Sequence, residues 1–288
     1  MAGSIERLGI VGTGTMGAGI AQVAVQAGID VWLVDAAPGA VELAVDRIGR
    51  GLARAVERGT LTDDARGAAL GRLHPAPDVE ALAGAQFVVE AVIEREAAKV
   101  EVIAALDRVL GADAVLASNT SSISITRLAA ATGRPDRVVG MHFFNPVPAM
   151  RLVELVRGVH SSEAAIGTAR DLALRLGKTP VEVRDYPGFV SNRLLMPMIN
   201  EAAYALLEGV ATAEAIDQVM TLGMNHPMGP LALADLIGLD VCLDIMRVLQ
   251  SGFGDDKYRP CPLLVNLVAA GYLGRKSGRG FFTYERRP

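Results

Sequence analysis

A histidine and a glutamate on two apolar segments of the chain have the chemistry of an acid–base pair. His142 lies near the end of the run Val138–Phe143, and Glu154 lies inside the run Leu152–Val156. Imidazole titrates close to neutral pH, and a carboxylate at its second ring nitrogen fixes the tautomer and stabilises the imidazolium. Each residue alone has a plainer interpretation, as a packed histidine or as one polar residue in a strand. Together they predict a general base and its partner, and a buried Glu154 would need such a partner.

A glycine-rich segment matches the pattern G-x-G-x-x-G, which occurs often by chance in a chain with 31 glycines. Here the match, Gly12 to Gly17, directly follows the expected strand Leu8–Val11 and opens a helical segment. Gly12 permits a tight turn, Gly14 lets the backbone approach a pyrophosphate, and Gly17 allows helix and strand to pack closely. This context predicts a dinucleotide site, and a glycine-rich turn without a ligand is the alternative.

The residues around this segment indicate which dinucleotide binds. Thr15 and Met16 fall at the N-terminus of the helix, where free N–H groups favour phosphates. Asp35 ends the second expected strand and is placed to bind a ribose 2′-hydroxyl. The two residues after it are alanines, so no arginine is present there for a 2′-phosphate. The sequence therefore predicts NAD rather than NADP.

The elements that must position these residues follow an alternating pattern. Short apolar runs alternate with longer amphipathic stretches through the first two thirds of the chain, which predicts parallel strands with helical crossovers. The expected strands are Leu8–Val11, Val31–Asp35, Phe87–Ala91, Ala114–Ser118, Val138–Phe143, Leu152–Val156 and Pro180–Val183. From Pro38 to Arg58 apolar residues recur at three- and four-residue steps, which predicts a long amphipathic helix. The fold class is α/β, with an N-terminal Rossmann-type, doubly wound, mostly parallel sheet.

The pattern changes near Asp185–Gly188, where proline and glycine interrupt the chain. Long helical runs follow, so we expect residues 1–186 to form an NAD-binding domain and residues 187–288 to form a smaller all-α domain. Apolar stretches such as Leu231–Leu239 and Leu263–Ala270 exceed what a domain of this size readily hides. We therefore expect a homodimer that forms through the C-terminal domain.

Composition narrows the partners and the compartment. The net charge of −4 lacks the basic excess that nucleic-acid binding needs. The uncharged run Gly9–Ile29 is as long as a membrane span, but its many glycines and polar residues argue against a lipid-facing helix, and no basic segment precedes it as in a secretory signal. The two cysteines form no C-x-x-C pair, which fits a reducing cytoplasm. We expect a cytoplasmic protein that binds neither nucleic acid nor membrane.

Several further segments give a resemblance that spans almost the whole chain. In chain order they are Val89-Glu90-Ala91-Val92-Ile93-Glu94, Ser118-Asn119-Thr120-Ser121-Ser122, His142-Phe143-Phe144-Asn145-Pro146-Val147-Pro148, Pro187-Gly188-Phe189-Val190-Ser191-Asn192-Arg193, Pro227-Met228-Gly229-Pro230 with Asp235-Leu236-Ile237-Gly238-Leu239-Asp240, and Leu273-Gly274-Arg275-Lys276-Ser277-Gly278-Arg279-Gly280-Phe281. With the glycine motif, they resemble the L-3-hydroxyacyl-CoA dehydrogenases, and in particular the stand-alone short-chain members. The resemblance implies NAD-dependent oxidation of an L-3-hydroxyacyl-CoA, with 3-hydroxybutyryl-CoA as the expected substrate, or the reverse reduction. It also implies a dimer.

The resemblance assigns catalytic roles to four residues. It makes His142 the base and Glu154 its partner, and it matches Ser121 and Asn192 to residues that hydrogen-bond the reacting oxygen and the thioester end of the substrate. Ser121 lies in a polar loop after a strand, and its alternative role is to cap a helix over Ile123–Ala130. Asn192 lies about one turn into the first expected helix of the second domain, and its alternative is a solvated helix residue.

Cofactor and substrate contacts are implied in the same way. Glu94 and Lys99 match positions that contact the nicotinamide half of NAD, with ordinary helix-surface charge as the alternative. We expect NAD contacts from Ala91 and Asn119 and substrate contacts from Asn145, Arg54 and Arg58, and we expect no metal. In one departure from the family, Gly51 replaces a serine that faces CoA and removes a hydroxyl donor, while Arg58 keeps the charge of a lysine.

Two other functions remain open at this point. Relatives that resemble lambda-crystallin use the same fold on a sugar acid such as L-gulonate. A non-catalytic NAD-binding structural protein is the third possibility, and the intact set of His142, Glu154, Ser121 and Asn192 argues against it.

Overall fold

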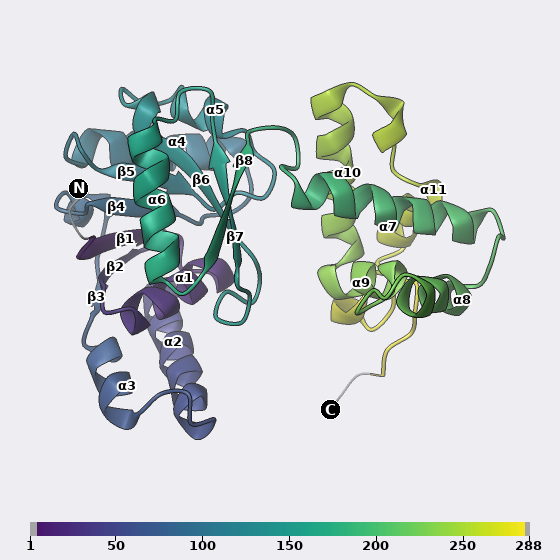
Figure 1. Cartoon of the computed structure of the whole chain (residues 1–288), viewed down its shortest axis with the longest axis horizontal. Helices are drawn as coiled ribbons and strands as arrows, with labels where there is room; N and C mark the ends of the chain where they lie inside the picture. Colours follow the sequence, from purple (N-terminus) through teal and green to yellow (C-terminus); the bar gives the residue numbers. More distant parts are fainter. Residues whose placement is uncertain (1–4, 286–288) are drawn as a thin grey trace. The chain divides into compact units, whose positions relative to one another are not determined.

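The computed structural model describes residues 5–285, which divide into two compact units on either side of the bond between Tyr186 and Pro187 (Figure 1). Residues 1–4 and 286–288, the outermost parts of the two expected domains, lie outside the described residues. The first unit is α/β and the second is helical, which confirms the expected fold class.

The strands of the first unit form one mostly parallel sheet. Within residues 5–285 the strands are β1 (Arg7–Val11), β2 (Asp30–Val34), β3 (Leu73–Pro75), β4 (Phe87–Glu90), β5 (Val115–Ser118), β6 (Val138–Phe143), β7 (Leu152–Arg157) and β8 (Thr179–Arg184). Their order is β3-β2-β1-β4-β5-β6-β7-β8, and among them only β6 and β7 pair antiparallel. The order reverses between β1 and β4, and ligands of open α/β sheets bind at the carboxyl ends of the strands beside such a reversal.

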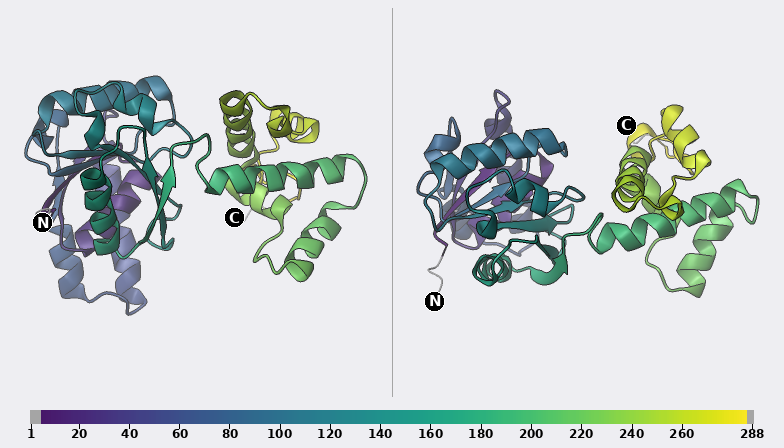
Figure 2. Two further views of the ribbon diagram at one scale, coloured as in Figure 1. Left: turned by 45° about the horizontal axis from the view of Figure 1, so that its top comes forward. Right: turned by 90° about the horizontal axis from the view of Figure 1, so that it is seen from above.

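Helices cover both faces of this sheet (Figure 2). They are α1 (Thr15–Gln26), α2 (Ala40–Glu57), α3 (Asp63–Leu70), α4 (Glu96–Val109), α5 (Ile125–Ala129) and α6 (Glu163–Arg175), with short 3₁₀ helices η1 (Val79–Leu82) and η2 (Pro135–Arg137). The apolar stripe of α2 explains its position, because Ile48 and Leu52 are fully buried while Arg50 and Arg54 are exposed. Fully buried side chains of the central strands, such as Phe87 and Val139, complete the core.

The second unit is built from helices packed around their own core. It contains α7 (Ser191–Leu207), α8 (Ala213–Gln218), α9 (Pro230–Ile237), α10 (Leu239–Phe253) and α11 (Pro262–Ala269), with a π-turn η3 (Val219–Gly223) and 3₁₀ helices η4 (Asp256–Tyr258) and η5 (Arg275–Ser277). Met196, Ile199 and Ala203 of α7 pack against Leu243 and Met246 of α10. No helix in residues 5–285 is long and apolar enough to span a membrane.

One expectation about these elements needs correction. The edge strand β3 is absent from the strands expected above, because it has three residues, is half-buried rather than apolar and ends at Pro75. In the apolar stretches expected to exceed this core, Leu231, Leu239 and Leu264 are fully buried, whereas Leu236 is 50% exposed and several residues of α11 are only partly buried. Other exposed apolar side chains of the second unit include Leu207, Val210, Val219, Leu222 and Met224.

Candidate active site

The glycine motif forms the turn between β1 and α1. Gly12 has a φ of +91°, a conformation that favours glycine, and an added Cβ would lie 2.6 Å from backbone atoms of Ala91 and Val92. At Gly17 an added Cβ would lie 1.8 Å from the carbonyl oxygen of Gly12, whereas Gly14 faces open space. The first turn of α1 has no acidic residue and no side-chain cap, so its N–H groups suit a phosphate. These residues fit the pyrophosphate of a dinucleotide.

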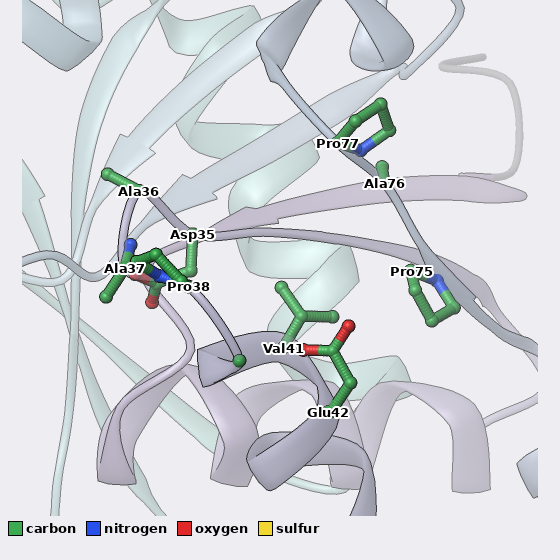
Figure 3. Close-up of a pocket in the computed structure, with 10 residues that line it drawn as sticks. Asp35, Ala36, Ala37, Pro38, Val41, Glu42, Pro75, Ala76 and Pro77 are labelled. Carbon is green, nitrogen blue, oxygen red and sulfur yellow. Dashed lines mark hydrogen bonds between the residues drawn. The ribbon is translucent and has the colours of Figure 1, made fainter.

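Asp35 follows β2 and lines a cavity of about 400 Å³ together with Ala36, Ala37 and residues 75–77 (Figure 3). Its Oδ2 accepts hydrogen bonds from Thr13 N (2.7 Å) and Thr13 Oγ1 (2.9 Å), and its Oδ1 accepts one from Ala37 N (2.9 Å). Partial burial favours the neutral form of Asp35, but the N–H groups of Ala37 and Thr13 outweigh that effect and lower its pKa. Asp35 therefore holds the glycine loop, and its charged carboxylate lies at the cavity in which a ribose hydroxyl would bind.

His142 and Glu154 form a buried pair across the β6–β7 ladder. They are directly opposite each other in the antiparallel register, so their side chains project from the same face of the sheet. His142 Nδ1 lies 2.8 Å from Glu154 Oε2, and the two side chains are 10% and 3% exposed. The ring of Phe144 packs on the imidazole with 4.6 Å between centroids. If Nδ1–H donates to Glu154, Nε2 carries the lone pair that takes a proton.

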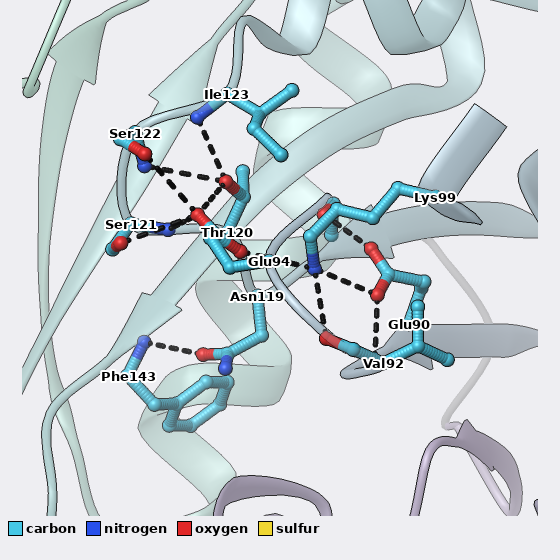
Figure 4. A network of polar contacts seen from close by, with 11 residues as sticks. Glu90, Val92, Glu94, Lys99, Asn119, Thr120, Ser121, Ser122, Ile123 and Phe143 are labelled. Atoms are coloured by element: carbon cyan, nitrogen blue, oxygen red, sulfur yellow. Dashed lines mark hydrogen bonds and ion pairs between the residues drawn. The ribbon is translucent and has the colours of Figure 1, made fainter. Parts of the chain in front are cut away.

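Glu94 organises the loop that carries Ser121 (Figure 4). Glu94 Oε1 accepts hydrogen bonds from Thr120 Oγ1 (2.6 Å), Ser121 N (2.8 Å) and Ser121 Oγ (3.2 Å). Partial burial favours the neutral form of Glu94, but the ammonium of Lys99 and the bonds from Thr120 and Ser121 outweigh it and lower its pKa. Glu94 is therefore an anion at neutral pH and holds this loop through hydrogen bonds.

The surface-charge alternative for Lys99 is wrong, because its side chain is 1% exposed. Its Nζ lies 2.8 Å from Glu90 Oε1, 3.3 Å from Glu94 Oε2 and 3.3 Å from the carbonyl oxygen of Val92. The alternative for Glu94 is also inaccurate, since Glu94 precedes α4 and lies in the segment after β4. Glu90 received no role from the sequence, although a charged residue at the end of the apolar run Phe87–Val89 is a signal of a buried polar site.

Two further residues follow the carboxyl end of β5. Asn119, after β5, donates its backbone N–H to the carbonyl of Glu90 (2.8 Å), and its Oδ1 accepts the N–H of Phe143 (2.9 Å), next to His142. Ser121 does not cap the following helix, because Ser124 does so by accepting the N–H of Arg127. The capping alternative for Ser121 is therefore wrong.

For the other expected site residues of the first unit, the structure gives no hydrogen bond or ion pair to the groups around His142 and Glu94 within residues 5–186. Asn145 is exposed after β6, and Arg54 and Arg58 are exposed on α2 and at its C-terminal end. Asn192 lies in the first turn of α7, which begins at Ser191, and not a full turn inside the helix. Their predicted substrate contacts stay predictions.

Gly51 lies where α2 packs on α1. An added Cβ at Gly51 would lie 2.3 Å from Gln22 Oε1, so the side chain of Gln22 fills this space. Residue 51 therefore supplies no hydroxyl, but the side-chain amide of Gln22 from α1 lies at the same place.

The fold and the arrangement of these groups define a class of protein. A glycine loop, the carboxylate of Asp35 and a histidine–glutamate pair lie at the edge of one sheet that the carboxyl ends of its parallel strands form. This is the arrangement of a dinucleotide-dependent dehydrogenase.

Comparisons with known proteins identify the family. Residues 7–186 match the family model of the 3-hydroxyacyl-CoA dehydrogenase NAD binding domain, and residues 188–284 match that of the C-terminal domain. A probable 3-hydroxybutyryl-CoA dehydrogenase of Bacillus subtilis is 54% identical over 283 residues, which cover 98% of this chain and 99% of that protein. The 3-hydroxyadipyl-CoA dehydrogenase of Escherichia coli is 41% identical, and the match covers 98% of this chain and 60% of that protein.

A solved structure agrees with these sequence matches. The crystal structure of (S)-3-hydroxybutyryl-CoA dehydrogenase from Ralstonia eutropha matches with a TM-score of 0.96 and 49% sequence identity. The match covers 98% of this chain and 100% of that chain. The chain belongs to the 3-hydroxyacyl-CoA dehydrogenase family and is an NAD-dependent oxidoreductase.

Proposed function

We propose that this protein oxidises L-3-hydroxybutyryl-CoA to the 3-oxoacyl-CoA, or catalyses the reverse reduction. The observation that carries the proposal is the buried contact of 2.8 Å between His142 Nδ1 and Glu154 Oε2, in the same sheet as the glycine loop. The names of the Bacillus subtilis and Ralstonia eutropha relatives support the substrate class.

The residues of this chain supply binding and proton transfer. Bound NAD⁺ supplies the acceptor for the hydride that leaves C3 of the substrate. The proton of the 3-hydroxyl moves to Nε2 of His142, and the carboxylate of Glu154 stabilises the imidazolium that results. Phe144 on the imidazole ring helps to exclude water from this transfer.

Substrate contacts come from residues that the resemblance assigns. Ser121 and Asn192 hydrogen-bond the reacting oxygen and the thioester end, and Asn145 also contacts the substrate. The exposed guanidinium groups of Arg54 and Arg58 suit the phosphates of CoA.

An assay of NADH formation tests the proposal with four substrates: L-3-hydroxybutyryl-CoA, a longer 3-hydroxyacyl-CoA, 3-hydroxyadipyl-CoA and L-gulonate. We expect the highest kcat/KM for the first and almost no turnover by the His142→Gln variant. A higher value for L-gulonate would establish the sugar-acid function, and a higher value for 3-hydroxyadipyl-CoA would favour the activity named for the Escherichia coli relative. Binding of NADH without turnover of any substrate would leave the non-catalytic function.

A homodimer through the second unit completes the proposal. Its support is the group of exposed apolar side chains on and after α7 and on α8 to η3, which include Leu207, Val210 and Leu222. A Leu222→Glu variant should shift sedimentation equilibrium toward monomer, and a monomeric wild-type protein at micromolar concentration would contradict the dimer. We also place the protein in the cytoplasm, since Cys242 and Cys261 are both free thiols.

A further inference from the structure

Glu90 is a fully buried carboxylate at the end of β4, in the middle of the sheet. Its Oε1 accepts hydrogen bonds from Lys99 Nζ (2.8 Å) and Val92 N (2.7 Å), and its Oε2 accepts one from Ser118 Oγ (2.6 Å). Figure 4 shows Lys99 of α4 and Val92 of the segment after β4 meeting at Glu90 of β4, and the bond from Ser118 adds β5. One carboxylate therefore joins four parts of the first unit.

Lys99 occupies a position that is unfavourable for a lysine by itself. Its ammonium is buried, which is costly without a partner, and it lies in the first turn of α4, where the helix dipole disfavours a cation. The two carboxylates on either side, Glu90 and Glu94, compensate both effects. The cluster of two glutamates and one lysine keeps one negative charge, and Glu94 is its partly exposed member, with 38% of its side chain exposed.

The cluster connects to two segments of the candidate active site. Through Val92 N, Glu90 fixes the backbone that packs directly against Gly12 of the glycine loop. Through Lys99, it fixes Glu94, which binds the N–H and the hydroxyl of Ser121. A shift of Glu90 would therefore reach both the phosphate-binding turn and the Ser121 loop.

We propose that Glu90 is a positioning residue, which acts through Lys99 and Val92 to set Glu94 and the glycine loop for cofactor binding. The inference rests on the proposed function only where it is tested by an activity assay. A buried ion pair often adds little net stability relative to apolar side chains of the same size. The positioning role and a purely structural role therefore give different results when both charges are removed together.

The experiment compares Glu90→Gln with the double variant Glu90→Gln/Lys99→Met. We expect Glu90→Gln to lower Tm and to raise KM for NAD⁺ about tenfold, the factor that one lost charge-assisted hydrogen bond implies, with a smaller change in kcat. The double variant leaves no unpaired buried charge and should regain most of the lost Tm. Its KM for NAD⁺ should stay raised, because neither Glu90 nor Lys99 then holds the Val92 backbone and Glu94 in place.

Asp107→Asn is the matched control. Asp107 lies at the other end of α4 and pairs with Arg134 (2.7 Å) in a partly buried site, so its loss should lower Tm without changing KM for NAD⁺. If Glu90→Gln does not fold, Ser118→Ala removes only the bond to Oε2 and should raise the same KM about threefold.

Two results would overturn the inference. One is a KM for NAD⁺ that returns to the wild-type value together with Tm in the double variant. The other is an unchanged KM in Glu90→Gln or, where that variant does not fold, in Ser118→Ala. Fluorescence titration with NADH gives the same comparison as a Kd without substrate, so wild-type protein that binds NADH but does not oxidise the acyl-CoA would refute the proposed function alone.

Discussion

The substitution Glu154→Gln tests the proposed base and its partner most directly. It removes the charge of Glu154 and nearly preserves the shape of the side chain. The contact with His142 Nδ1 is 2.8 Å long and its two side chains are 10% and 3% exposed, so water screens it little. A hydrogen bond between charged groups is worth about 1.5–3 kcal/mol, which corresponds to a rate factor of about 10 to 150. Because the imidazolium forms during the reaction, this loss should appear in kcat more than in KM.

The companion variants define the pair as a unit. His142→Gln removes the base and should lower kcat by at least about 10²–10⁴-fold while leaving acyl-CoA binding largely intact. The double variant should be little slower than His142→Gln, since Glu154 acts only through the histidine. Initial rates of NADH formation from L-3-hydroxybutyryl-CoA give all four values.

A matched control is Glu182→Gln, the same change at a carboxylate on β8 that pairs with Arg157. It should leave kcat unchanged. The reasoning fails if His142→Gln keeps a near-normal kcat, or if the losses of the two single variants multiply in the double variant. In either case the base is another group at the carboxyl ends of the strands.

Three other predictions concern the cofactor, pH and the thiols. Asp35→Ala should raise the Kd for NADH about tenfold or more in a fluorescence titration and weaken discrimination against NADPH, and an unchanged Kd would contradict its role. The hydrogen bond from Arg157 lowers the pKa of Glu182, so Glu182 stabilises the fold above its ordinary pKa and loses this effect as the pH falls through the lowered one. Glu182→Gln should therefore lower Tm at neutral pH and have no effect in strong acid; a constant difference between the two would refute the assignment. Burial raises the pKa of Cys242 to about 12 and also raises that of Cys261, so neither thiol should react with a thiol reagent until the protein unfolds.

Most strands of the first unit were predictable because they are apolar and lie between clear helices. Observed strand ends such as Arg7 and Glu90 differ from the expected ends by one residue, and β6 has the expected bounds. The strand β3 was not predictable, since its half-buried residues gain their place only by pairing with β2 at the edge of the sheet.

The candidate site was predictable in its parts but not in its contacts. The chemistry of His142 and Glu154 is visible in the sequence, whereas their contact depends on the register between β6 and β7. The burial of Lys99 is likewise a tertiary effect, because a lysine among helix residues gives no local sign that two carboxylates surround it. Asp35 was assigned to the ribose, but the hydrogen bonds that it accepts from Thr13 show that it also holds the glycine turn.

Because β6 and β7 pair antiparallel, the contact between His142 and Glu154 depends on whether the two strands shift by an odd or an even number of residues. Side chains alternate between the faces of a strand, so a slip of β7 by one residue would bring Val153 or Leu155 opposite His142 and turn Glu154 to the other face. The connecting segment 144–151 does not alternate in this way, and a change in its length need not alter the register. Insertions and deletions should therefore be tolerated in the loop 144–151 but not in β6 or β7. In these strands a shift by an odd number of residues would move Glu154 away from His142, although neither residue is substituted.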